Sequence, residues 1–513
     1  MNLDFIYNDL KTDRKVFEKD YEFILNQDII VPDSKPDILE ILHRNSNICI
    51  ERQENKDGRL KINGIVHVDV MYMADNESND IRALNTEIEL NQTIDIDEGY
   101  SDVIPRVCAN IDSIECKITN ERKIGVTAKV NCTARLESNE NINYIENIRD
   151  GNEDIQVLNS KLPVSKLLGN EFQNISISEE VSVSDVDIFE ILQTDVRIIN
   201  EEYKLSYNKV LVKADAVINI VYVTQNNNIG TQEIILPFTG FVDMAGITDN
   251  NIIDIHIDIK NRSVKLNDNK EDRKFSVNME IGANIKSFEN AEITIIEDMY
   301  SLTRGIGFDK CKICNDTLVC LDNVFHEVKE SIRFEEPDCK VIGISSKIAK
   351  SKIERINDKL HIEGEICLEI MCKDSNRIFI KTYQVPFTHI YDNQKAKLGN
   401  LYCLDASIKN VTYSVLNNCV DICVQIKLKI SIKNKMDFNI IANVREEDNR
   451  ILCPYSITIY YVKPHDSLWS IAKKFGTTIE EIAKYNDIDN PYEEILQIGR
   501  QLFIPQKIVK SVV

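Results

Sequence analysis

The hexapeptide Asp37-Ile38-Leu39-Glu40-Ile41-Leu42 recurs 150 residues further along the chain as Asp187-Ile188-Phe189-Glu190-Ile191-Leu192. A third copy is degraded, and its nearest match runs from Asp338 to Ile342. Self-similarity at a fixed spacing indicates a repeated unit, and a unit of this length is a whole domain rather than one turn of a solenoid. The sequence therefore predicts an array of similar domains.

The segments that follow each hexapeptide place small or apolar residues at every second position. These residues are Leu60, Ile62, Gly64, Val66, Val68, Val70 and Tyr72 in the first copy, Val210, Val212, Ala214, Ala216, Ile218, Ile220 and Tyr222 in the second, and Leu360, Ile362, Gly364, Ile366, Leu368, Ile370 and Cys372 in the third. A period of two is typical of a strand with one buried face. We therefore expect a mainly β protein with β-rich domains at residues 1–150, 151–305 and 306–450.

Composition limits the classes of function. The chain has 513 residues, 43% of them hydrophobic, and a formal net charge of −22. Nucleic acid and anionic lipid are polyanions, so this charge disfavours both as general partners. The N-terminal sequence has no basic segment followed by an apolar run, and no window approaches 18 apolar residues. These features predict a cytoplasmic protein with no membrane insertion.

No motif in the sequence indicates catalysis or a cofactor. The 14 Cys residues are scattered, and those within apolar runs are expected to be buried free thiols. Cys311 and Cys314 form a CxxC pair with Cys320 and His326 nearby, but a structural zinc site needs two further ligands at regular spacing. Two ordinary thiols are the favoured interpretation, so no metal is expected. The seven His residues show no metalloprotease spacing, and phosphate-binding and hydrolase motifs are also missing.

The C-terminal stretch 459–506 has the pattern of a small α+β unit. Asp466 or Ser467 can cap a helix whose apolar face is Leu468, Ile471, Ala472 and Phe475. Gly476 suits the end of that helix, and Thr478 with Glu481 has the spacing of a second helix start. A short strand, residues 501–504, follows and ends at Pro505. The predicted order is strand, helix, helix, strand.

This unit resembles the LysM family in its order and in its residues. The matching positions are Asp466, Leu468, Trp469, Ile471, Ala472, Asn486, Gly499, Leu502, Ile504 and Pro505. In sugar-binding members the groove lies between two loops, which the resemblance maps to His465, Asp466, Ser467, Leu468 and Trp469 and to Leu496, Gln497, Ile498 and Gly499. Purely structural roles stay open, with Asp466 as a cap and with Leu468 and Ile498 in the core. Trp469 could contact a ligand or only pack. His465 replaces the family's Gly, and this departure disfavours a sugar ligand.

The whole chain resembles the SPOCS-domain proteins of spore-forming Firmicutes, with the domain order of SipL-type spore-coat morphogenetic proteins. The resemblance rests on Pro36 to Leu42, on the alternating strands and on the single LysM module that follows three repeats. It implies a non-catalytic scaffold or adaptor in the mother cell, at the forespore surface where the coat is built. It also implies that the LysM domain docks a SpoIVA-like coat morphogenetic ATPase.

Two other hypotheses compete with this interpretation. In the first, the LysM domain binds peptidoglycan or another glycan that contains N-acetylglucosamine. In the second, the chain is a cell-wall hydrolase targeted by LysM, which would require a recognisable catalytic domain.

Overall fold

The structure is a computed structural model of the chain. It describes residues 4–96, 103–149, 154–183, 188–267, 274–334, 339–373, 378–396, 399–416, 419–447, 457–492 and 495–505. Asp187 and Asp338 of the repeat lie outside the described residues. Among these described residues nearly all regular structure is strand, with two short helices near the C-terminus, so the mainly β prediction is confirmed.

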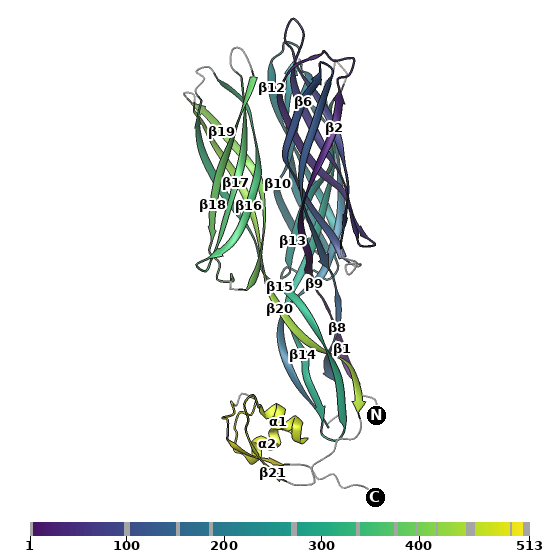
Figure 1. Cartoon of the computed structure of the whole chain (residues 1–513), viewed down its shortest axis with the longest axis vertical. Helices are drawn as coiled ribbons and strands as arrows, with labels where there is room; N and C mark the ends of the chain where they lie inside the picture. The colour runs from purple at the N-terminus through teal and green to yellow at the C-terminus, as the bar shows by residue number, and fades with distance from the viewer. Residues whose placement is uncertain are drawn as a thin grey trace.

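Each repeat forms two three-stranded antiparallel sheets that face each other across an apolar core (Figure 1). The first repeat pairs β2 (Arg14–Ile30), β7 (Lys123–Ser138) and β6 (Val103–Asn120), and β3 (Ile38–Lys56), β4 (Arg59–Ala74) and β5 (Ile81–Asp95). The second pairs β13 (Ile252–Leu266), β14 (Lys274–Ser301) and β9 (Ile155–Ser182), and β10 (Ile188–Ser206), β11 (Lys209–Thr224) and β12 (Ile229–Asp243). The third pairs β15 (Gly305–Arg333), β20 (Cys419–Glu447) and β19 (Asn400–Leu416), and β16 (Lys340–Ile356), β17 (Lys359–Lys373) and β18 (Ile378–Tyr391). The division at 150, 305 and 450 into independent folding units stays a prediction.

The alternating strands predicted from the sequence are β4, β11 and β17. The inward residues of β4 are buried as expected, but its other face is also buried from His67 to Met71. That face packs against the other domains instead of facing water. The one-sided alternation expected of an isolated sheet therefore holds only for the first half of the strand.

The hexapeptide forms the same β-bulge in all three copies. Its strand pairs Ile41 with Tyr72, and the equivalent pairs are Ile191 with Tyr222 and Val341 with Cys372. The register shifts directly after each of these pairs, so the next residue in each copy is left without a partner, and the first two copies have a further shift at Leu39 and Phe189. These residues are Leu42, Leu192 and Ile342. A bulge re-aims the side chain that it carries, and here it turns the side chain away from the domain's own core.

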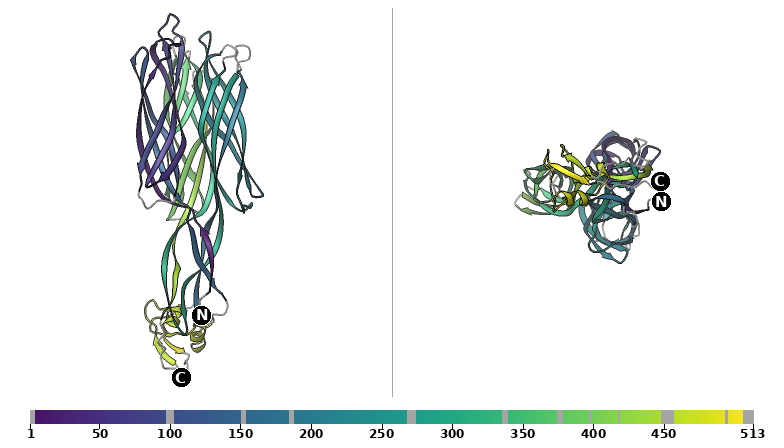
Figure 2. Two further views of the ribbon diagram at one scale, coloured as in Figure 1. Left: turned by 90° about the vertical axis from the view of Figure 1, so that its right-hand side faces the viewer. Right: turned by 90° about the horizontal axis from the view of Figure 1, so that it is seen from below.

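The three bulge residues meet in one apolar cluster at the junction of the domains, which we call the axial cluster. All three repeats contribute to it. Its members are Leu42, Met71, Ile81, Ala83, Leu192, Val221, Val223, Ile229, Ile342, Met371, Ile378 and Ile380. Seen along the long axis of the molecule, the three sandwiches lie around a common centre (Figure 2). The repeats therefore form one assembly with approximate three-fold symmetry, which the sequence did not predict.

Two charged residues of the hexapeptide form ion pairs. Asp37 forms an ion pair with Arg122, and that guanidinium also donates to the carbonyl oxygens of Val31 and Pro32. Glu190 of the second copy forms an ion pair with Lys35 of the first domain. The hexapeptide thus fixes both a loop within one domain and a contact between two.

Further from the junction, long strands leave the sandwiches and form a stalk (Figure 1). The outer halves of β9 with β14 and of β15 with β20 continue as two-stranded ribbons, and β1 (Phe5–Lys11) with β8 (Asn141–Ile148) forms the third. The ribbons pack through Leu10, Tyr144, Val164, Ile293 and Ile440. Each ribbon supplies apolar residues to this core, so the stalk depends on all three repeats.

Buried ion pairs join the repeats where the stalk begins. The ammonium of Lys286 lies 2.8 Å from Asp13 and 2.7 Å from Glu137, and Lys433 lies 3.3 Å from Asp13. Burial alone would raise the pKa of Asp13, but Lys286 and Lys433 hold it below its usual value. The carboxylate is therefore charged at neutral pH, and Lys286 and Lys433 together compensate this buried charge.

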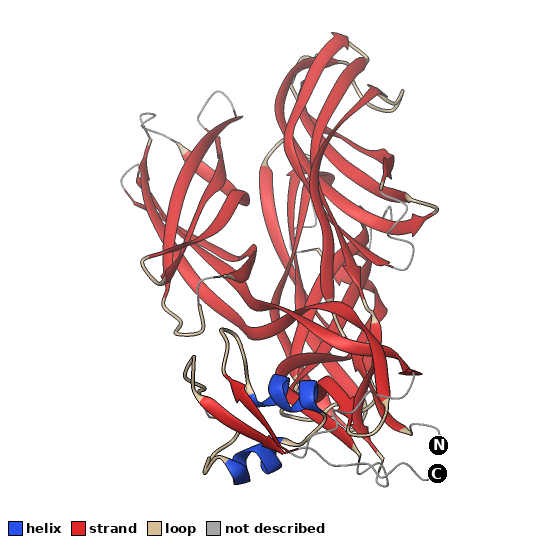
Figure 3. Ribbon diagram, turned by 60° about the horizontal axis from the view of Figure 1, so that its bottom comes forward, coloured by secondary structure: helices blue, strands red, loops and turns tan. Residues whose placement is uncertain are grey.

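The C-terminal domain consists of β21 (Ile457–Tyr461), α1 (Leu468–Phe475), α2 (Ile479–Tyr485) and β22 (Gln501–Pro505) (Figure 3). The predicted order of strand, helix, helix, strand is confirmed. Ser467 caps α1 and forms a reciprocal capping box with Ser470, Gly476 ends the helix in the left-handed region, and Thr478 caps α2. Neither helix in the described part of the chain has the length and apolar character needed to cross a membrane.

We expect Leu192→Ala to lower the free energy of unfolding by about 2–5 kcal/mol, because it empties a fully buried position in the axial cluster. Urea unfolding followed by circular dichroism measures this. The matched control is Leu39→Ala. It removes a half-exposed Leu from the first copy of the hexapeptide and should change stability by less than about 0.5 kcal/mol. Equal losses in both variants would contradict a special role for the axial cluster.

Candidate functional site

The two loops predicted to form the LysM groove lie side by side. The amide of Gly499 donates to the carbonyl of Val462 over 2.8 Å, and the amide of Val462 donates to the carbonyl of Arg500 over 3.0 Å. Asp466 accepts hydrogen bonds from the hydroxyl of Tyr460 and from the amide of Lys463, both 2.8 Å long. Asp466 therefore fixes the first loop, whereas the helix cap is Ser467.

The nine predicted groove residues differ in exposure. His465, Ser467, Gln497, Ile498 and Gly499 are exposed, and Asp466, Trp469 and Leu496 are partly buried. Leu468 is buried in the domain core, so its side chain is packed away from the loop surface. Ile498 is 70% exposed, which excludes the core role that the sequence left open for it. The loop surface thus presents an apolar side chain to solvent.

His465 adopts a backbone conformation that favours glycine. Its φ angle is 69°, in the left-handed region, where a side chain other than glycine is strained. This geometry gives a physical reason for the Gly that the LysM pattern carries at this position. The His side chain is retained at a cost in stability and projects from the first groove loop.

Asn486 shows why the LysM pattern carries an Asn between α2 and β22. Its side-chain nitrogen donates to the carbonyls of Ile482 and Phe503, over 2.7 and 2.8 Å, and its oxygen accepts from the amide of Phe503 over 2.7 Å. One side chain thus ties the end of the second helix to the last strand. The role is structural.

Trp469 contacts the base of the stalk. Its indole nitrogen donates to Asp298 over 2.8 Å, and its ring meets that of Tyr300 edge-on with centroids 4.9 Å apart. Lys473 lies one turn further along α1 and pairs with the same Asp298 at 2.6 Å. Asp298 and Tyr300 precede Trp469 by about 170 residues, and nothing in the sequence pattern marks them as its partners.

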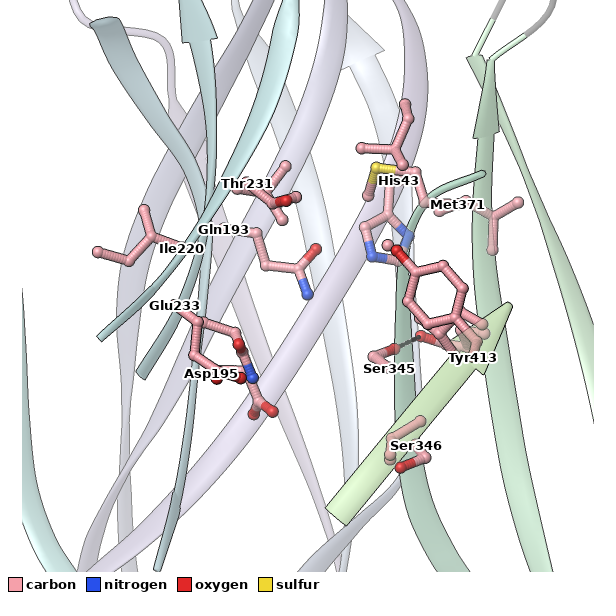
Figure 4. Close-up of a pocket in the computed structure, with 18 of the residues that line it drawn as sticks. His43, Gln193, Asp195, Ile220, Thr231, Glu233, Ser345, Ser346, Met371 and Tyr413 are labelled. Atoms are coloured by element: carbon pink, nitrogen blue, oxygen red, sulfur yellow. Dashed lines mark hydrogen bonds between the residues drawn. The ribbon is translucent and has the colours of Figure 1, made fainter. Parts of the chain in front are cut away.

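Apart from the groove loops, a pocket lies at the junction of the three domains (Figure 4). It has a volume of about 320 Å³ and takes residues from equivalent positions of the repeat, namely His43, Gln193 and Gly343. His43 and Gln193 point into it from β3 and β10. Asp195, Glu233 and Glu369 also line it, with Arg197 as a counter-charge. The lining combines apolar side chains with groups of both charges, and the hydroxyl of Ser345 donates to the carboxylate of Glu369 over 3.4 Å.

The CxxC pair cannot act as a local two-ligand unit. Cys311 and Cys314 lie on β15, and residues three apart on a strand point to opposite faces. Cys320 and His326 lie further along the same extended strand, so the strand does not bring them back to Cys311 or Cys314. Within the described ranges, no three His, Cys, Asp or Glu side chains lie close enough to hold a metal ion.

Comparison with known families identifies the repeats and the C-terminal unit. A family model described as SipL, SPOCS domain matches residues 37–119, 187–267 and 339–416, and a LysM domain model matches residues 460–505. The predicted architecture of three SPOCS domains and one LysM domain is confirmed. No curated protein and no solved structure matches the chain.

Burial lowers the pKa of His43 to about 4, against about 6.5 in an unfolded chain. The folded state therefore binds fewer protons than the unfolded state, and stability falls as the pH drops from about 6.5 toward 4. From pH 7 to pH 5 this residue should cost about 2 kcal/mol. His43→Gln introduces the residue that the second repeat has at this position and cannot become charged, so the variant should lose about 2 kcal/mol less over that interval. Urea unfolding of both proteins at the two pH values tests this, and parallel losses would contradict it.

The strain at His465 predicts opposite effects for two substitutions. His465→Gly relieves the left-handed strain and should stabilise the LysM domain by about 0.5–1 kcal/mol, even after the entropy of the unfolded glycine is counted. His465→Val places a β-branched residue in the same conformation and should destabilise it by about 1 kcal/mol or more. Thermal unfolding followed by Trp469 fluorescence reports both, and a loss of stability in the Gly variant would contradict the assignment of strain.

Proposed function

We propose, from the premise that this chain carries three SPOCS domains and one LysM domain, that it is a scaffold in assembly of the spore coat. The domain content marks it as a sporulation-related protein, and coat assembly follows from the SipL family. In this proposal the LysM domain docks a SpoIVA-like coat morphogenetic ATPase, and the three-domain body carries that contact at the forespore surface of the mother cell.

The proposal rests mainly on the character of the groove loops. Ile498 of the second loop is 70% exposed, and Ile495, directly before that loop, is 89% exposed. In the docked arrangement Trp469 is engaged with the stalk. Exposed apolar side chains in a paired-loop surface fit a protein partner, which can cover them and exclude water. Sugar hydroxyls need hydrogen-bonding groups instead, because burying them unpaired is costly.

The rigid body supports a scaffold role rather than a catalytic one. SPOCS and LysM are non-catalytic domain families. The three ribbons of the stalk share one apolar core. The stalk therefore holds the LysM domain at a defined position relative to the three SPOCS domains. In the proposed assembly, any nucleotide hydrolysis is carried out by the partner.

Glycan binding is the second candidate, because LysM domains as a class suggest it. The same groove loops would then bind N-acetylglucosamine-containing peptidoglycan. Sedimentation of the full chain with insoluble cell wall, with and without N-acetylglucosamine oligomers as competitors, separates this function from the adaptor.

We expect Ile498→Asp in the full chain to weaken binding of the coat ATPase by about tenfold or more, because it places a charge in an apolar contact. The matched control is Ile30→Asp, which alters an equally exposed Ile on β2 of the first domain (72% exposed) and should bind normally. Surface plasmon resonance with the purified ATPase measures both. Neither change should alter the thermal midpoint much, because both side chains are exposed. Normal binding by the Ile498 variant would exclude the groove loops as the docking site.

A further inference from the structure

The base of the stalk holds the LysM domain through a small set of residues that we call the stalk socket. It consists of Asp298 and Tyr300 on β14, Leu302 directly after that strand, and Phe308 on β15. Tyr300 and Leu302 belong to the same apolar cluster as the core of the LysM domain. The cluster therefore continues from the domain into the stalk.

One carboxylate of the socket binds two side chains of α1. Asp298 accepts the indole N–H of Trp469 over 2.8 Å on one oxygen and pairs with Lys473 over 2.6 Å on the other. Trp469 and Lys473 are four residues apart, so they share one face of the helix. The register of β14 shifts between Ile296 and Asp298, so Glu297, directly before Asp298, is left without a strand partner.

Two further contacts close the socket around the helix. The hydroxyl of Tyr300 donates to the carbonyl of Thr477 over 2.8 Å, just beyond the end of α1. The ammonium of Lys473 also lies 5.2 Å from the centre of the Phe308 ring, within the range of a cation–π contact. Contacts from two different strands thus hold both the start and the end of one short helix.

Trp469 is at the same time part of the first groove loop, and the contacts with the stalk occupy its only hydrogen-bond donor and part of its ring. A ligand that uses Trp469 has to replace Asp298 and Tyr300. We propose that the stalk socket and the partner of the LysM domain compete for Trp469, so that the docked arrangement is the closed form of the site. This inference rests on the proposed function, and it adds the regulation of that site: release from the stalk opens it.

The competition has a defined effect on affinity. If only a fraction of the molecules has the site open, the apparent dissociation constant rises by the inverse of that fraction. A substitution in the socket that removes contacts without touching the LysM domain should therefore tighten partner binding. A closed form that outnumbers the open form by about ten to one predicts a gain of about tenfold.

Fluorescence of the full chain tests the socket without any partner, because Trp469 is the single Trp of the sequence. Asp298→Ala should shift the emission to longer wavelength and raise the acrylamide quenching constant at least about twofold, since the indole becomes accessible to solvent. Tyr300→Phe keeps the ring and loses one hydrogen bond, so it should give a smaller change in the same direction. Glu292→Gln is the matched control, because Glu292 lies on the same strand and pairs with Lys161. Unchanged quenching in Asp298→Ala, with the fold intact by circular dichroism, would overturn the proposal.

Binding of the coat ATPase tests the competition itself. Asp298→Ala should bind several-fold to about tenfold tighter than the parent chain, and the added substitution Trp469→Ala should remove the gain. Equal or weaker binding by Asp298→Ala would overturn the competition while leaving the adaptor function standing. If neither the parent nor any variant binds the ATPase, both the adaptor function and the competition for that partner are wrong.

Discussion

The architecture depends on a β-bulge that turns one apolar residue out of each repeat. Leu42, Leu192 and Ile342 would each point at solvent or at their own sheet if the strand pairing were regular, and the bulge directs them to a common centre instead. None of the three can be buried well by its own domain. The burial of these residues therefore requires all three repeats at once, and it converts a linear array into a closed group.

The stalk and the LysM position follow from that grouping. Once the three sandwiches share a centre, their long strands leave it in the same direction, and each two-stranded ribbon finds two others to cover its apolar face. A single ribbon of this kind is marginal in water. The buried pairing of Lys286 with Asp13 and Glu137 adds a directional constraint, because a rotation of one repeat would leave these charges unpaired. The base of the stalk is thereby rigid enough to offer Asp298 and Tyr300 as a fixed surface.

Local patterns predicted the elements, whereas the relations between elements lay beyond them. The period of two identified β4, β11 and β17, and the caps at Ser467 and Thr478 were readable because they act within four residues. The burial of Met71 on the second face of β4 was not readable, since its partners come from other repeats. Likewise the loops of the groove could be located from the LysM pattern, but the orientation of Trp469 is decided by Asp298, which lies 171 residues away in the sequence.

That orientation bears on the choice between sugar and protein as ligand. A sugar groove needs polar groups that converge on hydroxyls and a surface on which the ring can lie. In this domain Asp466 is used within its own loop by Tyr460 and Lys463, and in the docked arrangement the indole of Trp469 is held by Asp298. What the loops leave facing solvent includes Ile498 and the strained His465. The carboxylate of Asp466 is already hydrogen-bonded within the domain, and the apolar side chain of Ile498 is exposed. Such a surface gains most binding free energy from a partner that buries apolar area. A protein buries this area more fully than a hydrated glycan chain does.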